Sequence, residues 1–559
     1  TPCGTLFPYT TLFRSVRWEE SDALQAYPDL ILLKFASSAA NISGKDLSSS
    51  ETFTWLREHF KTALSQCKPE LEQIFLSGVN HVFFHGSTYY PDEAAWPCWK
   101  FYASVNFVPN NTIWKDAPYM FDYISRCQSM LQSGASDNEI LIYWPFHDVI
   151  AKDRKGEILL QLAINNKEEW LTKTPFYKIA RNLIDKGYSV DFVSDQFIEN
   201  ALVSNENIEL NNSKYKALIV PDTKHMPHET LKTIYRLYET GGNVIFEGLP
   251  ETVPGYHNYK EREEEMLELM NNIQNDLVVS DDILSKLKEE RILPEEFKEH
   301  GLDFIRRDAG DGKIYFIVNH SQENFDKNIT LNTPSKSVII MDPLDGKSGK
   351  GKSKSRSQKT EVFVQLKPGE SLILRTFDEN QNIPEWAYYE ETGNPYELEG
   401  TWKLKFLSGG PEIPDEHDLN ELKSWTKFGD EEAAFSGTAH YELEFENPDL
   451  SVEHWAIDLG DVRESARVWI NDDYKGCFWS VPFSGEIGQL EEGTNKIQIE
   501  VTNLSANRLR DLELRGIEWK IFYEINMVNR HYTEFDATTW EPMPSGLLSK
   551  IKLQAMKEK

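Results

Sequence analysis

The sequence predicts a mixed α/β and all-β multidomain protein. Its 559 residues exceed what one hydrophobic core accommodates, and a prior of about 150 residues per domain suggests three or four domains. Strand-like and helix-like stretches alternate over roughly the first half of the chain. From about residue 303, short strands with Gly and Asn turns replace them, which is typical of β-sandwiches.

The first predicted unit covers residues 16–150. Apolar and small side chains recur at helical spacing over residues 30–41, a strand then leads into Glu51, and residues 79–84 form the next strand after a helical stretch. Another strand covers residues 139–144. Strand, helix and strand in this order, with polar residues where strands end, predict the C-terminal part of a (β/α)8 barrel.

Residues 151–275 predict a flavodoxin-like α/β domain. Short strands at residues 188–193, 216–220 and 243–247 alternate with helices, as in doubly wound parallel sheets. The glycines of this region form no G-x-G-x-x-G loop, which argues against a nucleotide site.

The remainder predicts two all-β domains. Residues 276–380 carry alternating strands such as 313–320 and 361–367, and we expect a β-sandwich there. Residues 381–559 are again rich in strands, with turns at Gly and Asn, and predict a second sandwich of the jelly-roll type.

The first 15 residues look like an artefact. Residues 5–15 match the translation of a widely used DNA sequencing adapter, and residues 1–15 lack the basic region, apolar core and cleavage site of a signal peptide. We therefore expect the natural protein to begin further upstream and leave its localisation open.

Composition narrows the choice of partner. The net charge is −31, from 90 acidic against 59 basic residues, which argues against nucleic acid or an anionic membrane surface. The sequence contains no run of about 18 apolar residues, so we expect no transmembrane helix. Aromatic residues make up 12% of the chain and suit both core packing and stacking on sugar rings. The five cysteines form no C-x-x-C pair and support neither a zinc ribbon nor a disulfide framework.

Glu51 is the first candidate for catalysis, because it lies at the predicted carboxyl end of a barrel strand, where that fold carries its catalytic side chains. A glycosidase needs two carboxylates, one to protonate the leaving oxygen and one to activate water or attack. The alternative is that Glu51 opens a helix and interacts with its dipole.

His81 and His85 are the next candidates. They lie four residues apart on a predicted strand, so both side chains share one face. They could hydrogen-bond a sugar hydroxyl or a catalytic carboxylate. Zinc ligation and a purely structural role are the alternatives, although no third zinc ligand is spaced nearby.

The loop after this strand is rich in aromatic residues. Tyr89, Trp99 and Tyr102 are among seven large rings within 20 residues, a density that suits a carbohydrate subsite. His147, in the stretch YWPFHD after another strand, is a further candidate for the same rim.

Eight stretches of the chain carry a resemblance to a known family: SSETFTW, GVNHVFFHGSTYY, WKFYASVNF, YISRCQSMLQSG, ILIYWP, WTKFGDEEAAFSGTAHYELEF, DLGDVRESARVWIN and VTNLSANRL. They resemble the family 106 glycoside hydrolases, which are α-L-rhamnosidases. The resemblance implies an enzyme that removes terminal α-L-rhamnosyl residues from plant or microbial polysaccharides and glycosides with inversion. It also implies a (β/α)8 barrel, accessory domains that include a galactose-binding-like jelly roll, a bound calcium ion, no organic cofactor, and a periplasmic or extracellular parent.

Members of this family carry several hundred residues before the matching region, including most of the barrel and at least one catalytic Glu. We therefore expect a C-terminal fragment that is inactive alone. By the resemblance, Glu51 is an acid/base or sugar-binding carboxylate. The residues expected to contact substrate are Trp55, His81, His85, Tyr89, Trp99, Tyr102 and His147.

Two other functions remain open at this point. One is a β-galactosidase-like glycosidase that shares the accessory domains. The other is a carbohydrate-binding protein without catalysis, since two sandwiches and an aromatic rim can bind glycans alone.

Overall fold

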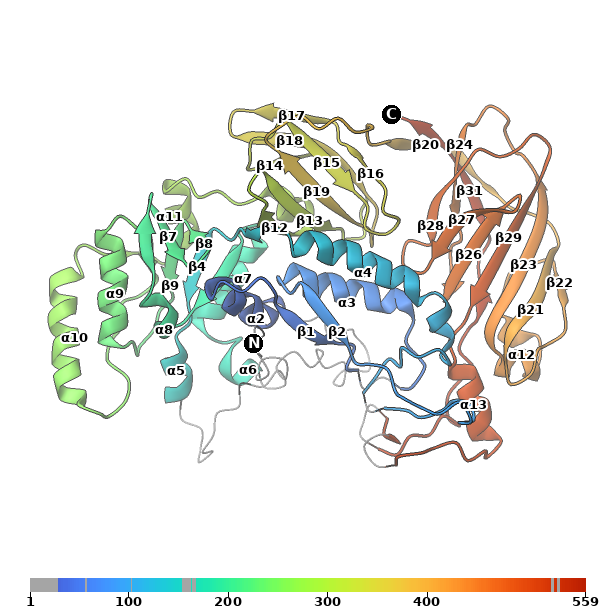
Figure 1. Cartoon of the computed structure of the whole chain (residues 1–559), viewed down its shortest axis with the longest axis horizontal. Coiled ribbons are helices and arrows are strands. Elements are labelled where there is room, and N and C mark those ends of the chain that lie inside the picture. The colour runs from blue at the N-terminus through green and yellow to red at the C-terminus, as the bar shows by residue number, and fades with distance from the viewer. Residues whose placement is uncertain are drawn as a thin grey trace.

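The structure is a computed structural model, and it describes residues 29–55, 58–101, 103–152, 162, 167–523, 527–529 and 533–559. In Figure 1 the α/β region lies at the left and a pair of helices in the middle, with one antiparallel β region above these helices and a second at the right. The prediction of a mixed α/β and all-β protein is therefore confirmed. The expected adapter-derived residues 1–15 and the candidate Tyr102 lie outside the described residues.

The central unit is a β-α-β arrangement. Strands β1 (Ser49–Thr52) and β2 (His81–Phe84) pair in parallel and are joined by helix α3 (Leu64–Leu76), as a parallel pair requires a crossover. Helix α4 (Ala117–Leu131) follows β2 and packs against α3. Val82 and Phe84 pack with these helices on one face of the strands. Among the described residues, the side chains of the opposite face are half-buried or exposed, and we call it the open face.

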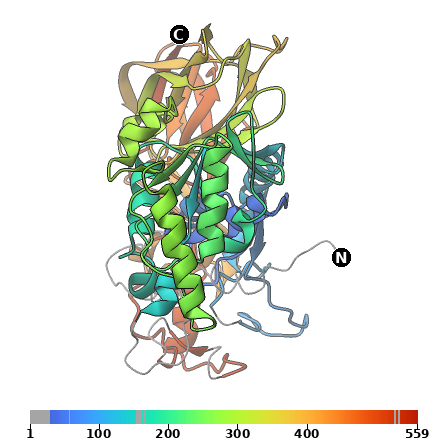
Figure 2. The ribbon, with the colours of Figure 1, turned by 90° about the vertical axis from the view of Figure 1, so that its left-hand side faces the viewer.

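The α/β region is built on a five-stranded parallel sheet in the order β11-β10-β9-β4-β5. Successive residues of β4 enter two different cores: Ile140 and Ile142 face one side, while Leu141 and Tyr143 face the other. Helices α9 and α10 cover one of these sides (Figure 2). The strands are β4 (Ile140–Tyr143), β5 (Val190–Val193), β9 (Ala217–Val220), β10 (Val244–Phe246) and β11 (Val278–Val279), and the helices are α5 (Phe146–Ala151), α6 (Lys167–Trp170), α7 (Pro175–Asp185), α8 (Asp195–Ile198), α9 (His228–Glu239), α10 (Tyr259–Ile273) and α11 (Ile283–Glu289).

Two segments that we assigned to the barrel part belong to this α/β region instead. Strand β4 lies between β5 and β9, so a boundary at residue 150 is wrong. Helix α2 (Leu30–Ile42) packs on β5, where the buried Asp191 accepts hydrogen bonds from Ser38 (3.0 Å) and Asn41 (3.1 and 3.2 Å). A buried carboxylate needs such donors, so these bonds attach α2 firmly to this sheet.

The first antiparallel region pairs a six-stranded sheet, in the order β16-β15-β19-β13-β12-β3, with a three-stranded sheet, β14-β18-β17. Strand β13 faces both ways: Tyr315 and Ile317 enter the core between the two sheets, and Phe316 packs with α3 and α4. The strands are β3 (Ala135–Ser136), β12 (Asp303–Asp308), β13 (Lys313–Val318), β14 (Phe325–Leu331), β15 (Ser337–Met341), β16 (Ser348–Lys350), β17 (Ser353–Arg356), β18 (Lys359–Leu366) and β19 (Ser371–Phe377).

The C-terminal region packs a four-stranded sheet, β20-β31-β24-β28, against a six-stranded sheet, β22-β21-β23-β29-β26-β27. Helix α13 (Ala506–Leu514) leads from it back to the central unit. The strands are β20 (Tyr389–Glu397), β21 (Trp402–Gly410), β22 (His417–Leu419), β23 (Ser436–Glu446), β24 (His454–Asp458), β26 (Ser465–Ile470), β27 (Asp473–Phe478), β28 (Ser484–Gly488), β29 (Thr494–Thr502) and β31 (Lys552–Glu558).

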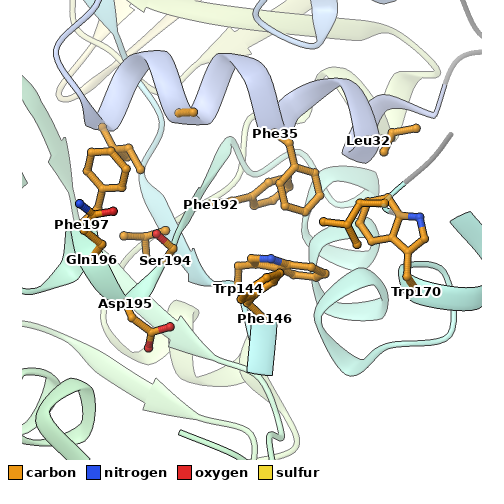
Figure 3. A pocket seen from close by; sticks show the side chains of 14 residues that line it. Leu32, Phe35, Trp144, Phe146, Trp170, Phe192, Ser194, Asp195, Gln196 and Phe197 are labelled. Atoms are coloured by element: carbon orange, nitrogen blue, oxygen red, sulfur yellow. The ribbon is translucent and has the colours of Figure 1, made fainter. Parts of the chain in front are cut away.

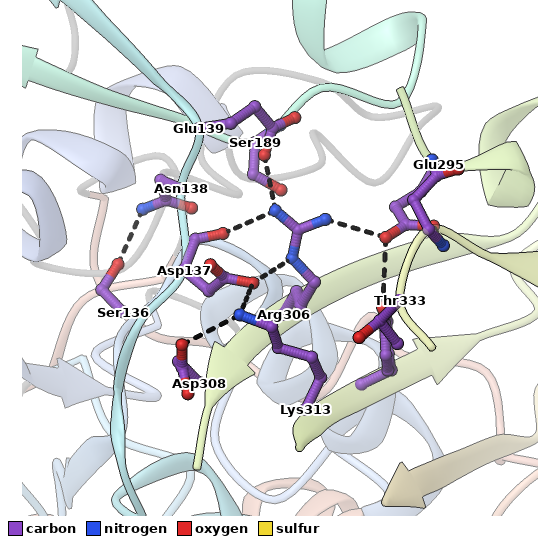
Figure 4. A network of polar contacts seen from close by, with 12 residues as sticks. Ser136, Asp137, Asn138, Glu139, Ser189, Glu295, Arg306, Asp308, Lys313 and Thr333 are labelled. Carbon is purple, nitrogen blue, oxygen red and sulfur yellow. Dashed lines mark hydrogen bonds and ion pairs between the residues drawn. The ribbon is translucent and has the colours of Figure 1, made fainter. Parts of the chain in front are cut away.

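A buried arginine joins the α/β region to the first antiparallel region (Figure 4). Arg306 of β12 contacts Asp137 at 2.5 Å, Glu139 at 2.7 Å and Glu295 at 2.8 Å. Asp137 and Glu139 lead into β4, so the guanidinium fixes the start of that strand to the six-stranded sheet. Within the part of the chain that the structure describes, no helix is long and apolar enough to cross a membrane.

Candidate functional site

The open face of the β1–β2 pair carries two of the predicted site residues, Glu51 and His81. Ser49 and Glu51 alternate on β1, and the register places them beside His81 and Phe83 of β2. The Phe83 side chain is 55% exposed, whereas Ser50 and Thr52 on the opposite face are buried. Strand alternation and the parallel register thus bring Glu51 and His81 to one face.

Glu51 is held by a neighbour in the sequence. The Thr54 hydroxyl donates a hydrogen bond of 2.6 Å to Oε1 of Glu51, which fixes one carboxylate oxygen. The alternative that Glu51 opens a helix is wrong, because Glu51 lies within β1 and helix α3 begins only at Leu64. The side chain is half-buried and reaches solvent on the open face.

The two histidines are oriented by different contacts. The Ser49 hydroxyl lies 3.4 Å from Nδ1 of His81, whose ring also packs on Phe83 at 4.4 Å between centroids. Nδ1 of His85 lies 2.8 Å from the carbonyl oxygen of Ala103. Because a carbonyl can only accept, Nδ1 of His85 carries the proton, and Nε2 is an acceptor in the neutral ring.

The loop that follows β2, residues 89–107, is called the aromatic loop, and it contributes an exposed group of rings beside this face. Tyr89 is 82% exposed, and its ring lies 6.5 Å from that of Trp99. Trp99 also meets Phe522 from the C-terminal region edge to face, at 5.2 Å and 89°. Phe101 packs on His85 at 4.9 Å and links the loop to the open face. Rings from two distant segments therefore form one aromatic rim.

The buried side of the same loop is anchored by stacked rings and cations. Trp96 stacks on Phe60 at 5.8 Å and 20°, and the Arg508 guanidinium lies 4.2 Å from the Trp96 ring. Lys100 is 1% exposed, and its Nζ lies 4.1 Å from the Phe60 ring without a hydrogen-bond partner among the described residues. Burial lowers the pKa of Lys100 to about 7.

Two expected substrate contacts lie elsewhere. Phe53 takes a φ of +67° directly after β1, which ends the strand alternation, and Trp55 then packs into the core at 3% exposure. His147 follows β4, so it lies in the α/β region, where Nε2 pairs with Asp195 at 3.4 Å. Neither residue shares the open face with Glu51.

Among the described residues, no group of three or more His, Cys, Asp or Glu side chains is close enough to hold a metal ion. Calcium also takes backbone and amide oxygens as ligands, so the calcium ion implied by the family resemblance stays a prediction.

Sequence reasoning missed three contributors to the site. Thr54 and Ser49 lie within three residues of Glu51, and strand alternation could have indicated Ser49. Phe522 is separated from Trp99 by more than 400 residues, and no sequence pattern indicates their contact.

Two known proteins similar to this chain carry the names of glycosidases. The chain matches a solved rhamnosidase structure from Novosphingobium sp. PP1Y with a TM-score of 0.74 at 19% identity, over 94% of this chain and 49% of that one. A curated relative named "Putative beta-glucuronidase" from Formosa agariphila is 24% identical over 330 residues, which are 57% of this chain and 26% of the relative. The chain thus spans about half of the solved structure and about a quarter of the curated relative.

The family comparison covers more than half of the chain. The model of glycoside hydrolase family 106, described as α-L-rhamnosidase, matches residues 20–152 and 160–352. This range includes β1, β2, the aromatic loop and the five-stranded sheet. The chain therefore belongs to glycoside hydrolase family 106, the family of the α-L-rhamnosidases.

Proposed function

We propose that this chain is the C-terminal half of an enzyme that hydrolyses terminal α-L-rhamnosyl residues with inversion. The observation that carries the proposal is the open face of β1 and β2, which Glu51 shares with His81 in a chain of this family. On this proposal β1, α3, β2 and α4 are two successive units of a (β/α)8 barrel, and the open face points into the barrel.

The finer fold assignments rest on sheet order. The five strands run β5-β4-β9-β10-β11, which is 2-1-3-4-5 in chain order and supports a flavodoxin-like domain. The two packed antiparallel sheets of the C-terminal region support a galactose-binding-like jelly roll.

Glu51 is the proposed acid, base or sugar-binding carboxylate. An inverting mechanism needs a second carboxylate about 6.5–9.5 Å away, one group protonating the glycosidic oxygen while the other activates water. Among the described residues of β1 and β2, Glu51 is the only carboxylate on the open face. The second carboxylate must then come from another barrel unit, and we expect the isolated chain to be inactive.

His81 and His85 are proposed to bind sugar hydroxyls. The Nε2 atom of neutral His85 is an acceptor, because its Nδ1 proton is committed to Ala103. Tyr89, Trp99 and Phe522 lie further out and offer ring surface to the sugar or aglycone that leaves.

The test uses a protein of the relatives' full length that carries this chain as its C-terminal half. We expect it to hydrolyse 4-methylumbelliferyl α-L-rhamnoside and to leave the corresponding β-D-galactoside and β-D-glucuronide intact. Release of galactose or glucuronic acid without rhamnose would overturn the substrate assignment. Saturable binding of rhamnosides without any hydrolysis would instead establish a binding protein.

A further inference from the structure

A cavity of about 380 Å³ opens at the carboxyl ends of β4 and β5, in a different part of the molecule from Glu51 (Figure 3). Ligands of open α/β sheets bind beyond the carboxyl ends of the strands, so the position is suitable for a site. Four rings, those of Phe35, Trp144, Trp170 and Phe192, supply much of its wall.

These rings are fixed by one another. Phe35 lies 5.1 Å from Trp144 and 5.1 Å from Phe192, and Trp144 meets Trp170 at 6.0 Å and 80°. Trp144 and Trp170 are buried; Trp144 directly follows β4, and Trp170 is the last residue of α6. The aromatic wall therefore exists before any ligand enters, which reduces the entropic cost of binding.

The polar groups of the cavity lie at one end, where Ser194, Asp195 and Gln196 follow β5. Oδ1 of Asp195 accepts hydrogen bonds from Tyr143 at 2.7 Å and Thr230 at 2.8 Å. Oδ2 has only the contact with His147, at 3.4 Å, among the described residues. Since a carboxylate oxygen has two lone pairs, Oδ2 can accept one more donor.

This distribution selects the class of ligand. A free sugar carries hydroxyls around its ring, and those facing the aromatic wall would lose their hydrogen bonds to water without replacement. An anion would meet the Asp195 carboxylate, in a protein with a net charge of −31. A flat, uncharged ring with a single hydrogen-bond donor at one end avoids both costs: it places no hydroxyl against the aromatic wall and no negative charge beside Asp195.

We propose that this cavity binds a planar aromatic compound of the phenol class, with its ring between Phe35, Trp144 and Phe192 and its hydroxyl donating to Asp195. The ring fills the apolar part by shape and dispersion. The strand-end motif YWPFHD then serves this second cavity through Trp144 and His147, instead of the rim around Glu51.

The probe is 4-methylumbelliferone, titrated into the 559-residue chain near pH 6, where its hydroxyl is protonated, with fluorescence anisotropy as the readout. We expect saturable binding at one site with a dissociation constant below about 1 mM, as ligand efficiencies of this size of compound allow. The 7-methoxy analogue, which lacks the donor, should bind about tenfold more weakly. L-Rhamnose should not displace the probe.

Two variants test whether the probe binds in this cavity. Ala39→Leu fills the cavity from α2 without removing a ring, and Asp195→Asn removes the charge with little change of shape; each should weaken binding at least about fivefold. Phe83→Ala, which removes an exposed ring on the other site, is the matched control and should bind like the original chain. Absence of saturation, equal binding of the methoxy analogue, unchanged binding by Ala39→Leu, or loss of binding in Phe83→Ala would each overturn the proposal. The readout needs no hydrolysis, so failure here leaves the proposed enzymatic function untouched.

Discussion

The imidazole of His320 lies between two carboxylates, with Nε2 3.3 Å from Glu72 and Nδ1 2.8 Å from Asp303. Glu72 belongs to α3 and Asp303 to β12, so this histidine joins the central unit to the six-stranded sheet. Burial alone would lower the pKa of His320, but hydrogen bonds to Asp303 and Glu72 outweigh it and raise the pKa to about 9. The imidazolium is therefore the form that the fold favours.

We predict that His320→Gln removes a pH-dependent part of the stability. The folded pKa of about 9 exceeds the unfolded value of 6.5, so the stabilisation is complete below about pH 6.5 and disappears as the pH rises through about 9. Its size is about 1–3 kcal/mol. Thermal unfolding from pH 6 to 10 should show the original chain approaching the variant as the pH rises. A constant gap across this range would contradict the prediction.

Arg306→Met should destabilise the protein by about 3–5 kcal/mol, because it leaves Asp137, Glu139 and Glu295 without their shared cation. The matched control is Arg356→Met, since that exposed side chain reaches Glu361 only at 3.7 Å and should cost under about 0.5 kcal/mol. Denaturant midpoints measure both variants, and similar midpoints would show that the buried network contributes little.

Lys100→Met should stabilise the protein at acidic pH. Burial lowers the folded pKa of Lys100 from 10.5 to about 7, so protonation opposes folding most strongly below pH 7, and the cost fades between pH 7 and 10.5. Methionine has a similar shape and no charge to bury, and we expect a gain of about 1–3 kcal/mol at pH 6. Denaturant unfolding at pH 6 and pH 9 should show that the gain in the free energy of unfolding becomes smaller as the pH rises. A larger gain at pH 9 than at pH 6 would contradict the prediction.

The sequence predicted features that depend on local spacing. Alternation along β2 placed His81 and Phe83 on one face, and the parallel register places Glu51 on the same face. Partner choice between strands is a tertiary property, and here the prediction was wrong for β4. Its apolar residues Ile140 to Tyr143 fit any buried strand, and only the packing of both faces assigns them to the α/β sheet.

The candidate site shows the same limit. The polar and aromatic residues of the loop after β2 are close in sequence, and Phe101 of this loop packs on His85. The prediction for His147 was wrong because His147 follows β4, and β4 belongs to the α/β sheet instead of the barrel. Phe522 could not be predicted, since its contact with Trp99 requires the C-terminal region to return to the central unit through α13.

Glu51→Gln should reduce kcat/KM for aryl α-L-rhamnosides by about 10² to 10⁴ in the full-length protein, as expected when an acid/base group is lost. The control is Glu58→Gln, because Glu58 pairs with Lys61 at 2.6 Å and does not lie on β1. Initial rates over a range of substrate concentrations give both parameters. A loss below tenfold, which is about 1.4 kcal/mol, would remove Glu51 from the catalytic groups.

Phe522→Ala should alter recognition of the leaving group without altering the chemical step. The Phe522 ring is 50% exposed and meets Trp99 edge to face, so it can extend the aromatic rim beyond the sugar that is cleaved. We expect KM for an aryl rhamnoside to rise about threefold to tenfold, as loss of one stacking ring costs about 0.5–1.5 kcal/mol, while kcat stays within twofold. Leu514→Ala on α13 is the control, because that side chain is also about half exposed and lies apart from the Trp99 contact. If kcat fell with unchanged KM, Phe522 would act on the arrangement of the catalytic groups, and the rim would have no part in binding the leaving group.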